Sequence, residues 1–124
     1  MRTLKRNQRK FYYCLYDNAE EIYDTYGNAT GEYIPLYKAH EAMYANVSPA
    51  SGYAQTEQFG NLDSYDKVIV TDWLNCPIDE NSVLFIDKDP EYSVDGKPLF
   101  DYTVRRVAKS LNSVSIAVQK VNVG

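Results

Sequence analysis

Short β-type runs separated by turns extend from residue 43 to residue 121 of this chain. The runs lie at residues 43–47, 67–71, 83–86, 102–104 and 114–118, where Val, Ile, Tyr, Phe and Thr recur. β-Branched and aromatic residues in short runs, bounded by Gly, Pro, Asn and Asp, are typical of strands. The pattern predicts an all-β fold with a small barrel of about six strands, because closing the sheet removes its exposed edges.

The stretch 102–111 allows two interpretations, because its apolar residues fit helical spacing as well as strand alternation. We predict a strand followed by a turn, since the β-branched run 114–118 needs a partner. In that run Val114, Ile116 and Val118 are expected to face the core, and the residues between and after them are expected to face outward.

The first 42 residues are expected to add an N-terminal extension or hairpin to the barrel. Residues 11–16 and 21–26 predict a hairpin joined by the polar residues between them. A second turn is predicted at residues 27–31, because Gly and Asn adopt the positive φ that tight reversals need. Residues 32–37 are then expected to form an edge strand, since Pro35 cannot donate to a ladder.

The length of 124 residues suits one domain, residues 1–124, with a single core. A chain of this size removes roughly two thirds of its unfolded surface from water without needing disulfides or metal. No apolar run approaches the length of about 18 residues that a membrane span requires, and the basic start is not followed by an apolar segment. We therefore expect a cytosolic protein that does not associate with a membrane. Cys14 and Cys76 are expected to be buried, where they act as small apolar residues.

Charge is distributed unevenly, although the net charge is only -4. A basic arm is predicted at residues 1–10, which contain Arg2, Lys5, Arg6, Arg9 and Lys10. Removing these five from the 13 basic residues leaves 8 against 17 acidic ones, a net charge of -9 for the remainder. Such an arm contacts an acidic neighbour or nucleic acid, or is simply a solvated terminus, and both interpretations stay open. The acidic remainder argues against a dedicated DNA-binding domain.

Tyrosine is unusually frequent, with 12 residues in the chain and eight of them among the first 44. Strand content explains part of this number, because aromatic residues favour strands. Tyr also combines a rigid apolar ring with a polar tip, which suits protein interfaces. The density near the N-terminus predicts a surface that meets other protein.

No catalytic or metal centre is predicted. His40 is the only histidine, and one His with two distant Cys cannot supply a zinc site. A calcium loop starting at Asp87 would need Gly at Tyr92 and Glu at Pro98, so this acidic segment is expected to be a solvated loop. We predict a non-enzyme without cofactor or metal.

The long polar loop at residues 48–66 is the remaining feature, since loops of this length inside a small domain tend to be functional. The order of segments resembles the head-tail joining (head-closure or stopper) proteins of long-tailed bacteriophages. The resemblance covers about residues 41–121, and it is carried by residues 45–52, 54–58, 68–70, 78–86 and 102–113. The tyrosine-rich first 40 residues lie largely outside it.

The resemblance implies a virion protein, encoded by a phage or prophage and assembled in the cytoplasm of the bacterial host. It would form a homo-oligomeric ring beneath the portal and adaptor, close the DNA channel after packaging, contact the DNA transiently and dock the tail proteins. A monomer is compatible with this before assembly. The loop 48–66 would point into the channel, with the expected plug residues Tyr53, Gln55, Glu57, Gln58 and Phe59. Neighbouring rings would be bound by Arg2, Lys5, Arg6, Arg9, Lys10, Tyr12 and Tyr33.

Two alternatives remain at this point. The first is a tail-completion ring, which differs in its neighbours rather than in its fold. The second is a small barrel unrelated to phage that binds protein or an oligonucleotide.

Overall fold

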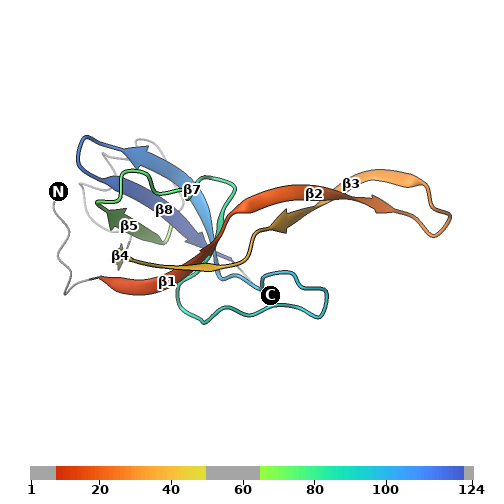
Figure 1. The fold of residues 1–124 in the computed structure, drawn as a ribbon, viewed down its shortest axis with the longest axis horizontal. Coiled ribbons are helices and arrows are strands. Elements are labelled where there is room, and N and C mark those ends of the chain that lie inside the picture. The colour runs from red at the N-terminus through yellow and green to blue at the C-terminus, as the bar shows by residue number, and fades with distance from the viewer. Residues whose placement is uncertain (1–7, 50–64, 122–124) are drawn as a thin grey trace.

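The computed structural model describes residues 8–49 and 65–121, and every regular element among them is a strand (Figure 1). The strands are β1 (Arg9–Cys14), β2 (Tyr16–Tyr23), β3 (Ala29–Tyr37), β4 (Glu41–Pro49), β5 (Lys67–Thr71), β6 (Val83–Phe85), β7 (Tyr102–Lys109) and β8 (Val114–Lys120). Of the loop predicted at residues 48–66, Ser48 and Pro49 belong to β4, and residues 50–64 lie outside the part of the chain that the structure describes.

Six of the strands close into an antiparallel barrel in the order β1-β4-β5-β8-β7-β6. Strand β1 completes the closure, because it pairs with β4 on one edge and with β6 on the other. Phe11 lies opposite Met43 of β4, and Tyr13 lies opposite Leu84 of β6. The predicted all-β barrel of about six strands is confirmed, while β2 and β3 form a separate two-stranded sheet (Figure 1).

The barrel interior is filled by alternate residues of its strands. Phe11, Met43, Ile69, Leu84 and Ile116 are each 5% exposed or less and belong to one apolar cluster. This alternation is the expected result of a strand whose successive side chains point to opposite faces. It confirms the inward face predicted for β8, where Val114, Ile116 and Val118 are all buried.

The expectation that the alternate residues of β8 are solvent-facing is wrong for two of them. Ser115 and Ala117 are 1% and 0% exposed, and only Gln119 is half-buried. Ala117 packs with Val68 in a small cluster separate from the interior, to which Tyr65, Val70 and Ala108 are adjacent. Strand β8 is therefore covered on both faces.

Strand β1 is also covered on both faces, and this overturns the hairpin predicted between residues 11–16 and 21–26. Phe11 and Tyr13 enter the interior, whereas Cys14 packs outside it with Val83 and Phe85. A two-stranded hairpin would pair only one edge of this strand, whereas the barrel pairs both edges and covers both faces. The polar residues 17–20, predicted to be a turn, are part of β2.

The second predicted turn and the predicted edge strand are both found close to their expected positions. The chain reverses at residues 24–28, where Gly27 has a φ of 81°. The turn predicted for 27–31 is therefore placed too late, because residues 29–31 already belong to β3. Strand β3 then pairs only with β2, with Pro35 opposite Ala19, which confirms its prediction as an edge strand. Cys14 and Cys76 are free and buried, as expected.

An irregularity in strand β7 explains why its sequence fits both helical spacing and strand alternation. Val104 pairs with Val118 and Arg106 with Ala117, so the ladder is irregular around Arg105. An extra residue in one strand restarts the alternation. Val104 and Val107 consequently both pack against the interior although they are three residues apart. The strand prediction is confirmed, and the helix-like spacing is produced by the irregularity.

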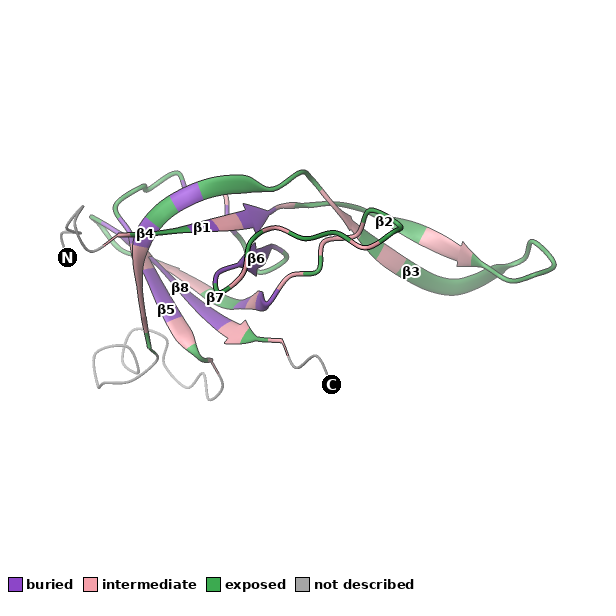
Figure 2. Cartoon of the chain, turned by 90° about the horizontal axis from the view of Figure 1, so that it is seen from below, coloured by how far each residue is buried: buried purple, intermediate pink, exposed green. Residues whose placement is uncertain are grey.

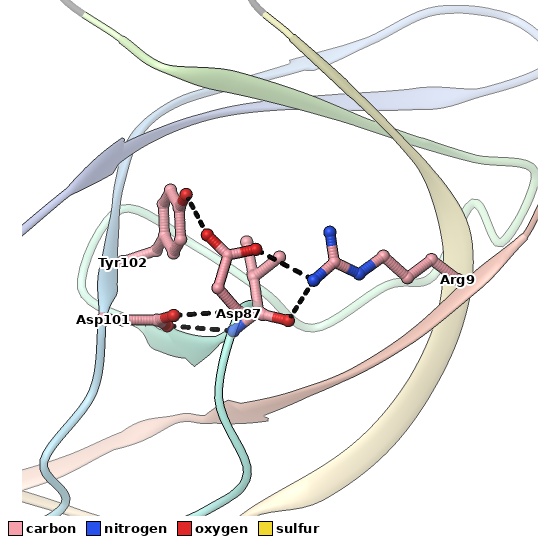
Figure 3. A network of polar contacts seen from close by, with 5 residues as sticks. Arg9, Asp87, Asp101 and Tyr102 are labelled. Carbon is pink, nitrogen blue, oxygen red and sulfur yellow. Dashed lines mark hydrogen bonds and ion pairs between the residues drawn. The ribbon is translucent and has the colours of Figure 1, made fainter.

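A polar network joins the start of β1 to the segment after β6 (Figure 3). The guanidinium of Arg9 donates from Nη2 to Oδ1 of Asp87 at 2.9 Å and to the carbonyl oxygen of Ile86 at 2.7 Å. The carboxylate of Asp101 accepts from the backbone N–H groups of Ile86 and Asp87 at 2.9 and 2.8 Å. The hydroxyl of Tyr102 donates to Oδ2 of Asp87 at 2.7 Å. Desolvation opposes ionisation of Asp87, but the bonds from Tyr102 and Arg9 outweigh it and lower the pKa of this carboxyl.

This network predicts an acid-dependent contribution to barrel stability. Asp87→Asn is expected to lower the free energy of unfolding by about 1 kcal/mol at pH 7, because it removes the ion pair with Arg9 and weakens the bond from Tyr102. A carboxyl with a lowered pKa stabilises the fold above its ordinary value of 3.8, and the contribution is lost as the pH falls through the lowered pKa. The difference in urea unfolding should therefore shrink toward zero at acidic pH.

The matched control is Glu91→Gln, which removes the exposed ion pair between Lys88 and Glu91 and should change little. A difference between wild type and Asp87→Asn that stayed constant down to pH 2 would contradict an ionised role for Asp87.

Candidate protein-docking arm

Strands β2 and β3 form an arm that projects from the barrel along the long axis of the molecule (Figure 1). They pack chiefly on each other. The arm is exposed or half-buried along its whole length, whereas the buried positions gather in the barrel (Figure 2). An isolated two-stranded sheet is at best marginally stable in water, so such an arm is typical of a segment that packs on a partner.

The tip of the arm is held by the side chain of Asp24. Its Oδ1 accepts from the backbone N–H groups of Tyr26 and Asn28, each at 2.9 Å. The backbone N–H of Gly27 donates to the carbonyl oxygen of Asp24 at 3.0 Å, and the N–H of Asp24 donates to the carbonyl oxygen of Asn28 at 2.9 Å. These bonds fix the reversal and present Tyr26, which is 88% exposed, at its end.

The base of the arm is anchored by aromatic contacts. The ring of Tyr37 meets Tyr16 of the paired strand and Phe100 in edge-to-face geometry, with centroids 6.3 and 6.2 Å apart. Tyr37 and Phe100 also pack on the buried cluster that contains Cys14. The backbone N–H of Lys38 donates to the carbonyl oxygen of Leu15 at 2.8 Å. The arm is therefore joined to the barrel on both of its strands.

The faces of the arm combine tyrosine with acidic residues. Glu21 lies opposite Tyr33, and Glu20 lies opposite Ile34 on the other face. Tyr23 and Tyr33 are each 60% exposed. Large aromatic surface left in water in this way suits an interface, where Tyr contributes contact area at a low entropic cost.

Residues 16–37 carry no Lys or Arg and five acidic residues, a net charge of -5. The acidic residues are Asp17, Glu20, Glu21, Asp24 and Glu32. A surface of one charge sign repels like-charged partners and attracts those of opposite sign. The arm is therefore suited to a basic protein surface and unsuited to the phosphates of nucleic acid.

A hollow of about 440 Å³ lies beside the base of the arm. Asp17, Glu20 and Leu36 line it from the arm, while Asp95 and Lys97 line it from the loop that follows β6. Its walls combine carboxylates with apolar carbon, which can receive the aliphatic stem and charged head of a Lys or Arg side chain. The candidate docking surface thus continues from the arm onto the loop that follows β6.

The residues predicted from sequence to bind partners are only partly brought together. Tyr33 lies on the arm, but Arg9, Lys10 and Tyr12 lie in β1. The boundary of the basic arm predicted at residues 1–10 is wrong, because β1 begins at Arg9. The remaining predicted residues lie outside the part that the structure describes: Arg2, Lys5, Arg6, Tyr53, Gln55, Glu57, Gln58 and Phe59.

In β1, the predicted partner-binding residues already have neighbours within the chain. Arg9 binds Asp87, the Nζ atom of Lys10 lies 5.3 Å from the ring centroid of Tyr12, and Tyr12 is half-buried against His40. Sequence reasoning did not single out Tyr23 and Tyr26, although both belong to the recognised cluster of tyrosines. The signal that marks the segment containing them is the absence of basic residues between positions 16 and 37, which does not distinguish them from Tyr16, Tyr33 and Tyr37.

The only histidine of the sequence contacts a tyrosine. Nδ1 of His40 lies 2.7 Å from the hydroxyl oxygen of Tyr92, and both rings are exposed. Burial raises the pKa of the Cys14 and Cys76 thiols, which keeps them protonated near neutral pH and unreactive. Within residues 8–49 and 65–121, no group of three or more His, Cys, Asp or Glu could hold a metal ion.

Comparison with known proteins found no matching family model, no matching curated protein and no matching solved structure. The described residues include no helix that is long and apolar enough to cross a membrane.

The tip geometry predicts that Gly27 is required for a stable arm. A Cβ atom at this position would meet nothing within 4 Å, so the cost of Gly27→Ala comes from the φ of 81° alone. For a non-glycine residue that cost is about 1–2 kcal/mol. Amide hydrogen exchange in β2 and β3 should accelerate by roughly tenfold, while exchange in the barrel and its melting temperature stay unchanged.

The matched control is Thr25→Ala in the same reversal, since the φ of Thr25 is not positive. Equal acceleration in both variants would contradict a specific role for Gly27, and loss of the whole barrel in Gly27→Ala would show that the arm is not a separate cooperative unit.

Proposed function

We propose that this chain is a protein-binding assembly module of a phage particle, namely a head-tail connector of the head-closure type. In this proposal the protein forms a ring beneath the portal and adaptor, closes the DNA channel after packaging and docks the tail. The barrel is the body of each subunit, and the projecting arm binds the neighbouring component. The proposal joins the resemblance in residues 41–121 to the arm, which lies largely outside that resemblance.

The observation that carries the proposal is the exposed arm of β2 and β3 with its tyrosines. A closed barrel leaves no free strand edge of its own, so the arm is the element that offers edges and apolar surface to a partner. Tyr23, Tyr26 and Tyr33 are each 60% exposed or more, which is a poor arrangement for a lone chain in water. It is a suitable arrangement for a subunit that is completed by assembly.

Charge favours a protein partner over an oligonucleotide. Small barrels that bind oligonucleotides use basic grooves with stacking aromatic residues. The arm has aromatic residues but carries a net charge of -5. Within a connector, the same repulsion would keep packaged DNA from adhering to this part of the protein while it passes.

The proposed plug remains the loop 48–66. In a ring, copies of one loop are brought together, so weak contacts per subunit combine into a strong closure through effective concentration. The residues proposed to make that closure are Tyr53, Gln55, Glu57, Gln58 and Phe59.

The test of the proposed function is electron microscopy of particles made after deletion of the gene from the phage or prophage that carries it. Free tails beside tailless heads that leak DNA are the expected result. Normal infectious virions would overturn the connector proposal.

Complementation of that deletion with arm variants separates docking from folding. The triple variant Tyr23→Ser, Tyr26→Ser and Tyr33→Ser is expected to fold as the wild type does, because these side chains are exposed, and to lower the yield of joined particles by at least about tenfold, as loss of one interface contact of roughly 1.4 kcal/mol would do. The matched control is Tyr44→Ser, which removes a 58% exposed tyrosine from the barrel strand β4. Full yield from the arm variant would contradict docking through the arm.

A further inference from the structure

The two most strongly charged segments of the chain are complementary and are separated in space. Residues 1–10 carry five basic residues and no acidic one, whereas residues 16–37 carry five acidic residues and no basic one. Strand β1 begins at the end of the barrel away from the arm, and β2 continues from it into the arm (Figures 1 and 2). Arg9, the first residue of β1, therefore lies at the opposite end of the described structure from the acidic tip.

Chain length disfavours contact between the two segments of one molecule along most of the arm. From Arg9 to Glu21 the strands β1 and β2 advance 12 residues, which is about 40 Å at about 3.3 Å per residue. The eight residues before Arg9 span at most about 28 Å when fully extended. The path from Arg9 to Glu21 is thus longer than this span, and β2 runs on from β1 away from the start of β1 (Figure 1), which disfavours contact with the tip within one molecule.

We propose that the acidic, tyrosine-bearing arm of one copy binds the basic residues that precede β1 in a second copy, namely Arg2, Lys5 and Arg6. This contact joins unlike surfaces of identical chains. Made head-to-tail, its repetition generates a closed ring or an open filament, whereas made reciprocally it closes a two-fold dimer. The inference rests on the proposed function, in which a ring is required, and it names the contact that would build the ring.

Three features of the described residues support this occupant. The arm offers five carboxylates without a basic residue among them. It also offers exposed tyrosine rings, and Lys10 already lies 5.3 Å from the ring centroid of Tyr12, which shows the cation–π geometry that a basic segment can repeat on Tyr23 or Tyr33. Both edges of the two-stranded sheet lack a neighbouring strand in the described part of the chain. The arm therefore matches a basic segment in charge and in aromatic contact, and has room to receive it.

Exposed ion pairs are individually weak and are screened by salt. Association must then depend on several pairs together and decline as the Debye length falls from about 10 Å at 0.1 M salt to about 3 Å at 1 M. This salt dependence distinguishes the contact from a purely apolar one, which added salt does not weaken.

The test is a charge exchange followed by sedimentation velocity of the full chain at low ionic strength. One variant carries Glu20→Lys, Glu21→Lys and Glu32→Lys in the arm, and the other carries Arg2→Glu, Lys5→Glu and Arg6→Glu. We expect wild type to associate in a concentration-dependent manner, each variant alone to associate at least about tenfold more weakly, and an equimolar mixture of the two to recover association. Circular dichroism verifies that each variant keeps the β fold.

The matched control reverses three exposed acidic residues outside the arm, Glu80→Lys, Asp89→Lys and Glu91→Lys, and should associate as wild type does. Wild type that stays monomeric with a Kd weaker than about 1 mM would overturn the inference. Arm and control variants that behave alike, or a mixture that fails to recover, would overturn it as well.

Failure of this inference and failure of the proposed function give different results. Particles with a joining defect but no association of purified protein would leave the connector role intact and remove the contact between copies. If the purified protein associates but gene deletion gives normal virions, the contact between copies stands and the connector role is overturned.

Discussion

The closure of the barrel at β1 is the constraint on which the other features depend. This strand has apolar side chains on both faces, so it is stable only where a neighbour covers each side. Pairing with β4 and β6 satisfies its two edges, Phe11 and Tyr13 fill the interior, and Cys14 packs on the outer cluster with Phe85. The bonds from Arg9 to Asp87 and to the carbonyl oxygen of Ile86 then hold the start of the strand against the segment that follows β6.

Closure also determines that the next two strands stand apart. Once β1 has joined β4 and β6, every barrel strand has two neighbours, and no edge remains for β2 or β3. These strands can pair only with each other, and the resulting arm has no core of its own. It is held at the tip by Asp24 and at the base by Tyr16, Tyr37 and Phe100, and its remaining aromatic surface faces water. The same closure that stabilises the barrel thus produces the surface that needs a partner.

Local sequence patterns predicted the strands from residue 43 onward because each run is short, β-branched and bounded by turn residues. They did not predict the pairing of β1, because the cover for Cys14 comes from Val83 and Phe85, about 70 residues away in the chain. The ambiguity in β7 has a local cause, since the irregularity around Arg105 places Val104 and Val107 on one face. Tyrosine density indicated a protein-binding surface, but composition alone cannot separate a buried ring such as Tyr13 from an exposed one such as Tyr26.

The net charge of -4 is the sum of two oppositely charged segments and a mixed remainder. Residues 1–10 and 16–37 carry +5 and -5, and the remaining 8 basic and 12 acidic residues are intermixed. A symmetric contact between two arms would set five carboxylates against five, and a contact between two basic segments would be equally repulsive. Attraction arises only between an arm and a basic segment. A chain with this distribution disfavours contact between two arms and favours contact between an arm and a basic segment, which is the type of contact from which a ring can be built.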